Sequence, residues 1–76
     1  MPLVKAGESL QIPAKYSSVK VANESMSKNG ACNIVFDSGT QNVQIPAGQS
    51  KTVDLHKNEA ELDNTGSTDL EVTLNP

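Results

Sequence analysis

The sequence predicts an all-β protein, built as a small antiparallel β-sandwich or barrel of about six strands. Apolar and polar residues alternate with a period of two in several short runs, which is the pattern of strands with one buried face. Residues that favour turns separate these runs about every 8–12 positions. No segment repeats apolar residues at the roughly 3.6-residue spacing of a helix, so we expect no long helix.

In the first half of the chain, alternation predicts strands within residues 8–12, 17–22 and 32–36. Residues 1–7 are expected to form a lead-in without a strand. Pro13 ends the first strand because proline has no N–H group to donate to a sheet. The polar stretch 23–30 ends in Asn-Gly, a strong turn signal, and precedes the third strand. A turn at Asp37–Thr40 then joins the two halves.

In the second half, alternation predicts strands around residues 43–45, 53–55 and 70–74. The segment 57–63 is ambiguous, because it could form one helical turn or a short strand. We favour the short strand, in which Ala60 and Leu62 point inward. A turn at Asn64–Ser67 precedes the last strand.

The core is expected to be aliphatic, because the chain has one tyrosine, one phenylalanine and no tryptophan. The residues expected in it are Leu10, Ile12, Val19, Val21, Ile34, Phe36, Val43, Ile45, Val53, Leu55, Leu70, Val72 and Leu74. Residues 1–76 are expected to form a single domain. A domain this small often needs a disulfide, a metal or a partner subunit. One cysteine and one histidine favour neither of the first two, so we expect association with another copy or with a protein partner.

A short stretch occurs twice, as Leu10–Ala14 and again as Val43–Ala47. Extended forward, the likeness divides the chain into two tandem three-strand repeats, residues 8–38 and 41–75, related by a pseudo-twofold axis. The alternative is chance, because alternation alone makes any two strands look alike. The shared Ile-Pro-Ala and the later Asn-Glu pairs favour a repeat.

The charge of the chain restricts its partners. The net charge is −3 and there is no arginine, which argues against nucleic acids and anionic membrane surfaces as partners. No run of about 18 apolar residues could span a membrane, and the first residues lack the apolar centre of a signal peptide. We therefore expect a cytoplasmic protein, or one assembled into a virion-like particle.

Two side chains with reactive potential are His56 and Cys32, and each has a structural interpretation. A catalytic histidine needs an orienting partner, and Asp54 only shares the same face of the strand. We expect His56 to be a solvated surface residue. Cys32 shares the inward face with Ile34 and Phe36, which predicts a small buried hydrophobic residue and not a nucleophile.

Acidic residues suggest two further sites, and each also has a simpler interpretation. The loop Asp63–Asp69 has oxygen ligands around a glycine, but it lacks the spacing and final glutamate of an EF-hand, so we interpret it as a turn. Five acids could form a patch if their strands are neighbours: Glu59, Glu61, Asp63, Asp69 and Glu71. A solvated face is the simpler interpretation. We therefore assign no catalytic, cofactor-binding or metal-binding residue and do not expect an enzyme.

The second half also resembles a known pattern. Val43–Gly48, followed by Val53–Leu55 and then by Asn64–Val72, is similar to segments of small β-sandwich structural proteins of phage particles and bacterial surfaces. The resemblance covers about half of the chain. It implies a structural or adhesive role and carries over no functional residues.

Two functions follow as hypotheses. The first is a structural or interaction module that associates with itself through sheet edges or an exposed sheet face. The alternative is a module for a small ligand, such as a carbohydrate, that binds through the polar loops Asn23–Gly30 and Asn58–Ser67. Carbohydrate sites usually stack the sugar ring on an aromatic side chain, and only Tyr16 and Phe36 are present.

Overall fold

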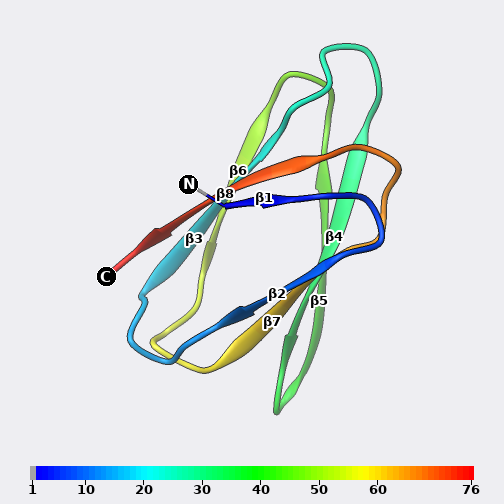
Figure 1. The fold of residues 1–76 in the computed structure, drawn as a ribbon. Helices are drawn as coiled ribbons and strands as arrows, with labels where there is room; N and C mark the ends of the chain where they lie inside the picture. The colour runs from blue at the N-terminus through cyan, green and yellow to red at the C-terminus, as the bar shows by residue number, and fades with distance from the viewer. Residues whose placement is uncertain (1) are drawn as a thin grey trace.

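The computed structural model describes residues 2–76 and contains two antiparallel sheets of four strands each (Figure 1). Within these residues there is no helix, and the sheets do not close into a barrel. The strands are β1 (Leu3–Val4), β2 (Ser9–Ile12), β3 (Ser18–Asn23), β4 (Gly30–Phe36), β5 (Gly39–Ile45), β6 (Ser50–Asp54), β7 (Ala60–Asn64) and β8 (Leu70–Asn75). The predicted all-β fold is therefore confirmed.

The two sheets take strands from both halves of the chain. Sheet A has the order β1-β8-β3-β6, and sheet B has the order β2-β7-β4-β5. Only β4 and β5 are consecutive in the chain and adjacent in a sheet, and their hairpin projects from one end of the molecule (Figure 1). The edges of the sheets are therefore β1, β6, β2 and β5.

The core lies between the sheets and is aliphatic, as predicted. Its buried residues are Val4, Ile12, Val19, Val21, Cys32, Ile34, Val43, Ile45, Val53, Leu55, Ala60, Leu62, Leu70 and Val72. Three residues expected in the core, Leu10, Phe36 and Leu74, are only partly buried and pack against it. Alternation shows which side chains of a strand point toward the other sheet. It does not show how far the other sheet extends, so side chains beyond its end are only partly covered.

The prediction of about six strands was wrong, because the described residues form eight. The segment expected to be a lead-in contains β1, whose Val4 lies opposite Leu70 of β8. Two residues are too few to show alternation, so this strand is defined only by its partner. The strand favoured within residues 57–63 is confirmed, and it forms β7 in the middle of sheet B.

The repeat boundaries 8–38 and 41–75 are not confirmed. The two similar stretches lie in β2 and β5, at opposite edges of the same sheet. The turns that follow them also differ, because only the second contains a glycine with positive φ, Gly48 at 71°. Apolar alternation that ends at a proline is a local pattern, and it does not require two segments to hold equivalent places in a fold.

The strand order shows a different internal relation. Replacing each strand of sheet A by the strand four places away in chain order turns β1-β8-β3-β6 into β5-β4-β7-β2. This is the order of sheet B read in reverse. The turns that precede β2 and β6 match as well. Glu8 N donates to Lys5 O at 2.9 Å, and Gln49 N donates to Pro46 O at 3.0 Å. In each turn the third residue is a glycine with positive φ, at 84° and 71°.

Two buried asparagines hold equivalent positions in this arrangement, at the ends of β3 and β7. Asn23 Nδ2 donates to Ile45 O, the last residue of β5, at 3.0 Å. Asn64 Nδ2 donates to Val4 O, the last residue of β1, at 2.9 Å. Each Nδ2 also donates to a carbonyl in the following loop, and each Oδ1 accepts from the N–H two residues further on. The amides therefore satisfy backbone groups where strands end.

Candidate functional site

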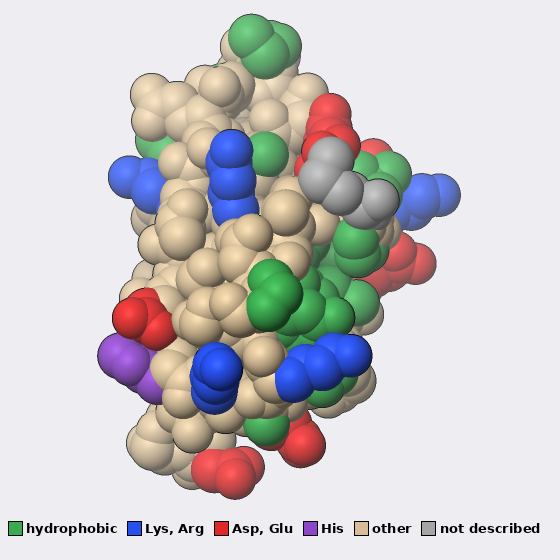
Figure 2. Space-filling model, turned by 90° about the vertical axis from the view of Figure 1, so that its left-hand side faces the viewer, with side chains coloured by type: hydrophobic (Ala, Val, Ile, Leu, Met, Phe, Trp, Pro, Cys, Tyr) green, Lys and Arg blue, Asp and Glu red, His purple; other side chains and the backbone are tan. Residues whose placement is uncertain are grey.

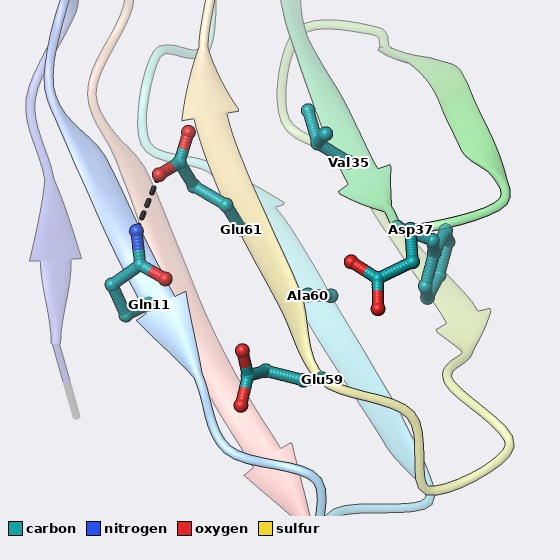
Figure 3. A pocket seen from close by; sticks show the side chains of 7 residues that line it. Gln11, Val35, Asp37, Glu59, Ala60 and Glu61 are labelled. Atoms are coloured by element: carbon teal, nitrogen blue, oxygen red, sulfur yellow. Dashed lines mark hydrogen bonds between the residues drawn. The ribbon is translucent and has the colours of Figure 1, made fainter.

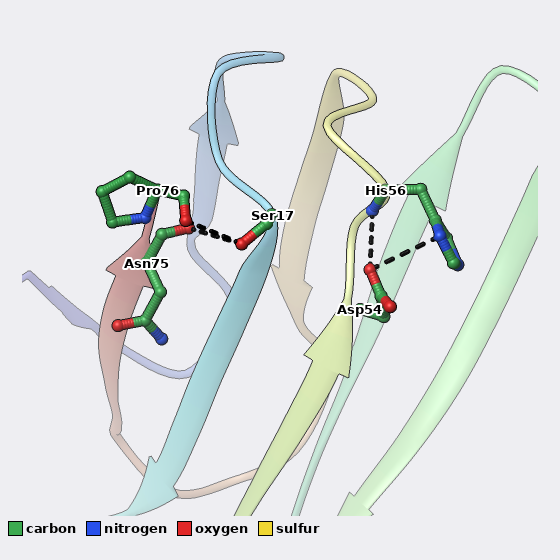
Figure 4. Close-up of polar contacts among 5 residues, drawn as sticks. All are labelled: Ser17, Asp54, His56, Asn75 and Pro76. Carbon is green, nitrogen blue, oxygen red and sulfur yellow. Dashed lines mark hydrogen bonds and ion pairs between the residues drawn. The ribbon is translucent and has the colours of Figure 1, made fainter.

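His56 lies in the turn after β6, which the Asp54 carboxylate caps. Its φ is 51°, its backbone N donates to Asp54 Oδ1 at 2.9 Å, and its Nδ1 lies 3.5 Å from the same oxygen (Figure 4). Both side chains are mostly exposed, at 74% and 66%. His56 is thus a surface residue, as predicted, although it lies in a turn and not on the strand.

Figure 4 also shows how the C-terminal end of β8 is held. Ser17 Oγ donates to Pro76 O at 2.8 Å. Ser17 N also donates to Asn75 O at 2.8 Å. These contacts join the residue before β3 to the end of β8.

Cys32 is fully buried in β4, as predicted. Burial raises the pKa of its thiol to about 11, because the anion would lose its hydration. The thiolate is the nucleophilic form of cysteine, so this side chain is inert at neutral pH.

The loop Asp63–Asp69 is a structural turn in this fold. Asp63 accepts a hydrogen bond from Ser9 Oγ at 2.7 Å, and Asn64 is the buried amide that holds the turn. Within residues 2–76, no three His, Cys, Asp or Glu side chains are placed to hold a metal ion together.

The five acids do not form one patch, because their strands belong to different sheets. Glu61 and Asp63 are on β7 of sheet B, whereas Glu71 is on β8 of sheet A. Near Glu71, the pKa of Glu24 is raised, first by a hydrogen bond with the Glu71 carboxyl and then by repulsion from its charge. Figure 2 shows charged groups of both signs scattered over one face of the molecule, with no large region of one sign.

A hollow of about 200 Å³ lies at one end of sheet B (Figure 3). It is lined by Gln11, Val35, Phe36, Asp37, Glu59, Ala60 and Glu61. On one side of the hollow, Gln11 Nε2 donates to the carboxylate of Glu61. A second hollow of about 260 Å³ shares Phe36, Asp37 and Glu59 with the first. Phe36 is therefore a wall of both hollows and not a core residue.

The loop Asn23–Gly30, predicted to contribute to a ligand site, lines neither hollow. It packs against the turn before β6, where Gly48 N donates to Ser25 O at 2.8 Å and Ala47 N donates to Asn29 Oδ1 at 3.2 Å. Of the other predicted loop, only residues 58–61 line the hollows. The two loops therefore do not form the site that the sequence predicted.

The outer face of sheet B is a row of hydrogen-bonded polar side chains. Pairing between strands places Ser9, Asp63, Asn33 and Asn42 side by side across all four strands. Asn42 Nδ2 donates to Asn33 Oδ1 at 2.8 Å, and Gln44 Nε2 donates to Asn42 Oδ1 at 2.8 Å. The row ends at β5, the edge of the sheet.

This edge strand differs from the other three. β5 has seven residues, Gly39–Ile45, and its sequence GTQNVQI contains neither a charged residue nor a proline. Its first four residues are exposed, together with Gln44. The other edges are shorter: β1 has two residues, β2 has four and precedes Pro13, and β6 has five, including Lys51 and Asp54. Sequence reasoning predicted only the end of this strand, around residues 43–45, and wrongly assigned Gly39 and Thr40 to a turn. It also missed the place of the strand at an edge, which local alternation does not encode.

No family model, curated protein or solved structure matches the chain. Within the residues that the structure describes, no helix has the length and apolar character needed to cross a membrane.

Proposed function

We propose that this protein is a structural or interaction module that associates with copies of itself through the edge strand β5. The observation that carries this proposal is the uncharged seven-residue edge. An edge strand exposes unpaired N–H and C=O groups that can pair with another chain. Natural sheets commonly block such edges with charged residues, proline or very short strands, and β5 has none of these features.

The size of the core supports the same function. A chain of 76 residues that relies on aliphatic side chains gains little stability from its own core. Pairing at an edge adds backbone hydrogen bonds without requiring a large apolar surface. The exposed residues of β5 are polar but uncharged, so a second chain could approach without leaving a buried charge unpaired.

Sedimentation velocity tests the proposal, with one variant at the edge and one matched control. We expect the parent protein to associate as its concentration rises from low micromolar to near millimolar. Asn42→Lys should weaken this association, because it adds a charge to the exposed edge. Thr52→Lys adds the same charge at an exposed position of the edge strand β6 and should behave like the parent. A parent that stays monomeric throughout, or equal effects of both substitutions, would contradict the proposal.

A second candidate function is the binding of a small ligand such as a carbohydrate. It is favoured by the hollow that is lined by the Phe36 ring and by the carboxylates of Asp37 and Glu59. Aromatic faces and carboxylates are groups that sugars use for stacking and hydrogen bonding. A glycan array with the parent and Glu59→Gln would test this function, with Tyr16→Ala as the control outside the hollow. No signal from the parent would remove it.

We also infer that the chain is built from two equivalent halves of four strands, β1–β4 and β5–β8. The strand orders of the two sheets, the matched glycine turns and the paired buried asparagines support this inference. These boundaries replace the three-strand repeats that the sequence suggested.

A further inference from the structure

The hairpin between β4 and β5 determines which backbone groups of β5 face outward. Phe36 lies opposite Gly39, with only two residues between them in the turn. A pair that closes such a short turn exchanges both of its backbone hydrogen bonds, and in an antiparallel ladder this pattern recurs at every second residue. The alternate residues Thr40, Asn42 and Gln44 therefore direct their N–H and C=O groups away from β4.

From this pattern we propose that two copies of the protein pair β5 with β5 in antiparallel orientation, with Asn42 of each copy opposite Asn42 of the other on a twofold axis. This inference rests on the proposed function and specifies its partner and register. Thr40 then lies opposite Gln44 of the second copy, and all three outward residues of each copy are paired. A shift of the register by two residues leaves at least one of them without a partner.

The side chains on both faces of β5 suit this register. On the outer face, the polar row from Ser9 to Asn42 would meet the same row of the second molecule at Asn42. The two rows would then form one row across both molecules. On the inner face, the exposed Gln41 would lie opposite Val43 of the second copy, a residue that is 8% exposed. Within the two paired β5 strands no like charges meet, because β5 has no charged residue.

The same geometry limits the assembly to two copies. A twofold contact uses the same edge of both molecules, so it closes and leaves no second β5 free. The remaining edge of sheet B is β2, which has four residues and ends at Pro13. We therefore expect a dimer with one continuous eight-stranded sheet and not a filament.

Cysteine cross-linking under mild oxidation tests the register in the full-length protein. In the proposed dimer the two Cα atoms of residue 42 are about 5.5 Å apart, within the limit of about 7 Å for a disulfide. Asn42→Cys should therefore cross-link to itself. Thr40→Cys or Gln44→Cys alone should not cross-link. In each case the same residue of the second molecule lies four positions further along the strand, about 13 Å away. A mixture of these two variants should cross-link. The parent is the control, since its Cys32 is buried.

The outcomes separate the register from the proposed function. If sedimentation shows association that depends on β5 but Asn42→Cys does not cross-link, the register is wrong and the proposed function stands. Self-cross-linking of Thr40→Cys or Gln44→Cys alone would also overturn the register. If sedimentation shows only monomer for the parent, both proposals fail together.

Discussion

At the scale of single residues, Asn23 and Asn64 connect the ends of strands that lie far apart in the chain. We expect Asn64→Ala to lower the free energy of unfolding by about 2–4 kcal/mol, because it removes three hydrogen bonds between this buried side chain and the backbone. Asn23→Ala should have a similar effect. Denaturant unfolding followed by circular dichroism measures both changes.

The control for these two substitutions is Asn33→Ala, on the outer face of sheet B. Among the described residues, the half-buried side chain of Asn33 bonds to Asn42 alone, through a solvent-exposed hydrogen bond, so the expected loss is below about 0.5 kcal/mol. If Asn23→Ala and Asn64→Ala unfold like this control, the two asparagines do not hold the strand ends as described.

Cys32 makes stability depend on alkaline pH. The pKa of its thiol is about 11 in the folded protein, whereas an unfolded cysteine titrates at about 8.5. Between these values the folded state binds more protons than the unfolded state. Stability therefore falls as the pH rises through this window, by up to about 1.4 kcal/mol per pH unit. The stability contributed by the neutral thiol is fully present below the lower value.

A comparison with Cys32→Ala isolates this effect, because all other titrating groups are shared. Equilibrium unfolding between about pH 8 and pH 10.5, from just below the unfolded pKa to just below the folded one, should show a steeper decline for the parent than for the variant. Parallel profiles would show that the thiol titrates alike in both states.

At the scale of elements, alternation is reliable where a strand is long enough to display it. Val19 and Val21 predicted β3, and Leu70 and Val72 predicted β8, because one face of each strand is buried. β1 was not predicted, because its two residues are too few to show alternation.

Two isoleucines end edge strands of sheet B with their side chains in the core. Ile12 is 1% exposed and Ile45 is 0% exposed. We expect each substitution, Ile12→Ala and Ile45→Ala, to lower the free energy of unfolding by about 2–5 kcal/mol. In a domain of this size that is a large part of the total stability. Thermal unfolding measures the loss, and a variant that melts like the parent would contradict the core as described.

At the scale of the whole molecule, each sheet takes two strands from each proposed half of the chain. Fragments 1–38 and 39–76 should therefore be unfolded when separate, since neither can form a complete sheet with a covered face. Mixing them should restore β-sheet circular dichroism if the halves recognise each other. A fragment that folds alone as a monomer would contradict the interlocked arrangement.

The sequence could not predict this arrangement, for a physical reason. Alternation places Ile45 on a buried face, but it does not say that β5 lies at an edge or that β7 lies between β2 and β4. The similarity of Leu10–Ala14 to Val43–Ala47 suggested boundaries that the structure does not confirm, because both are strands that end at proline. For the candidate site, sequence reasoning suggested association through sheet edges or an exposed sheet face as a hypothesis, but it could not point to β5, since an edge exists only after the sheet has formed.

Amide hydrogen exchange at β5 tests the central claim most directly. If β5 pairs with its own copy, the amides of Thr40, Asn42 and Gln44 should become protected as the protein concentration rises, and should lose that protection on dilution. The outward amides of β6, an edge with Lys51 and Asp54, should exchange rapidly at every concentration. Rapid exchange at Thr40, Asn42 and Gln44 in a sample that sedimentation shows to be associated would contradict the claim.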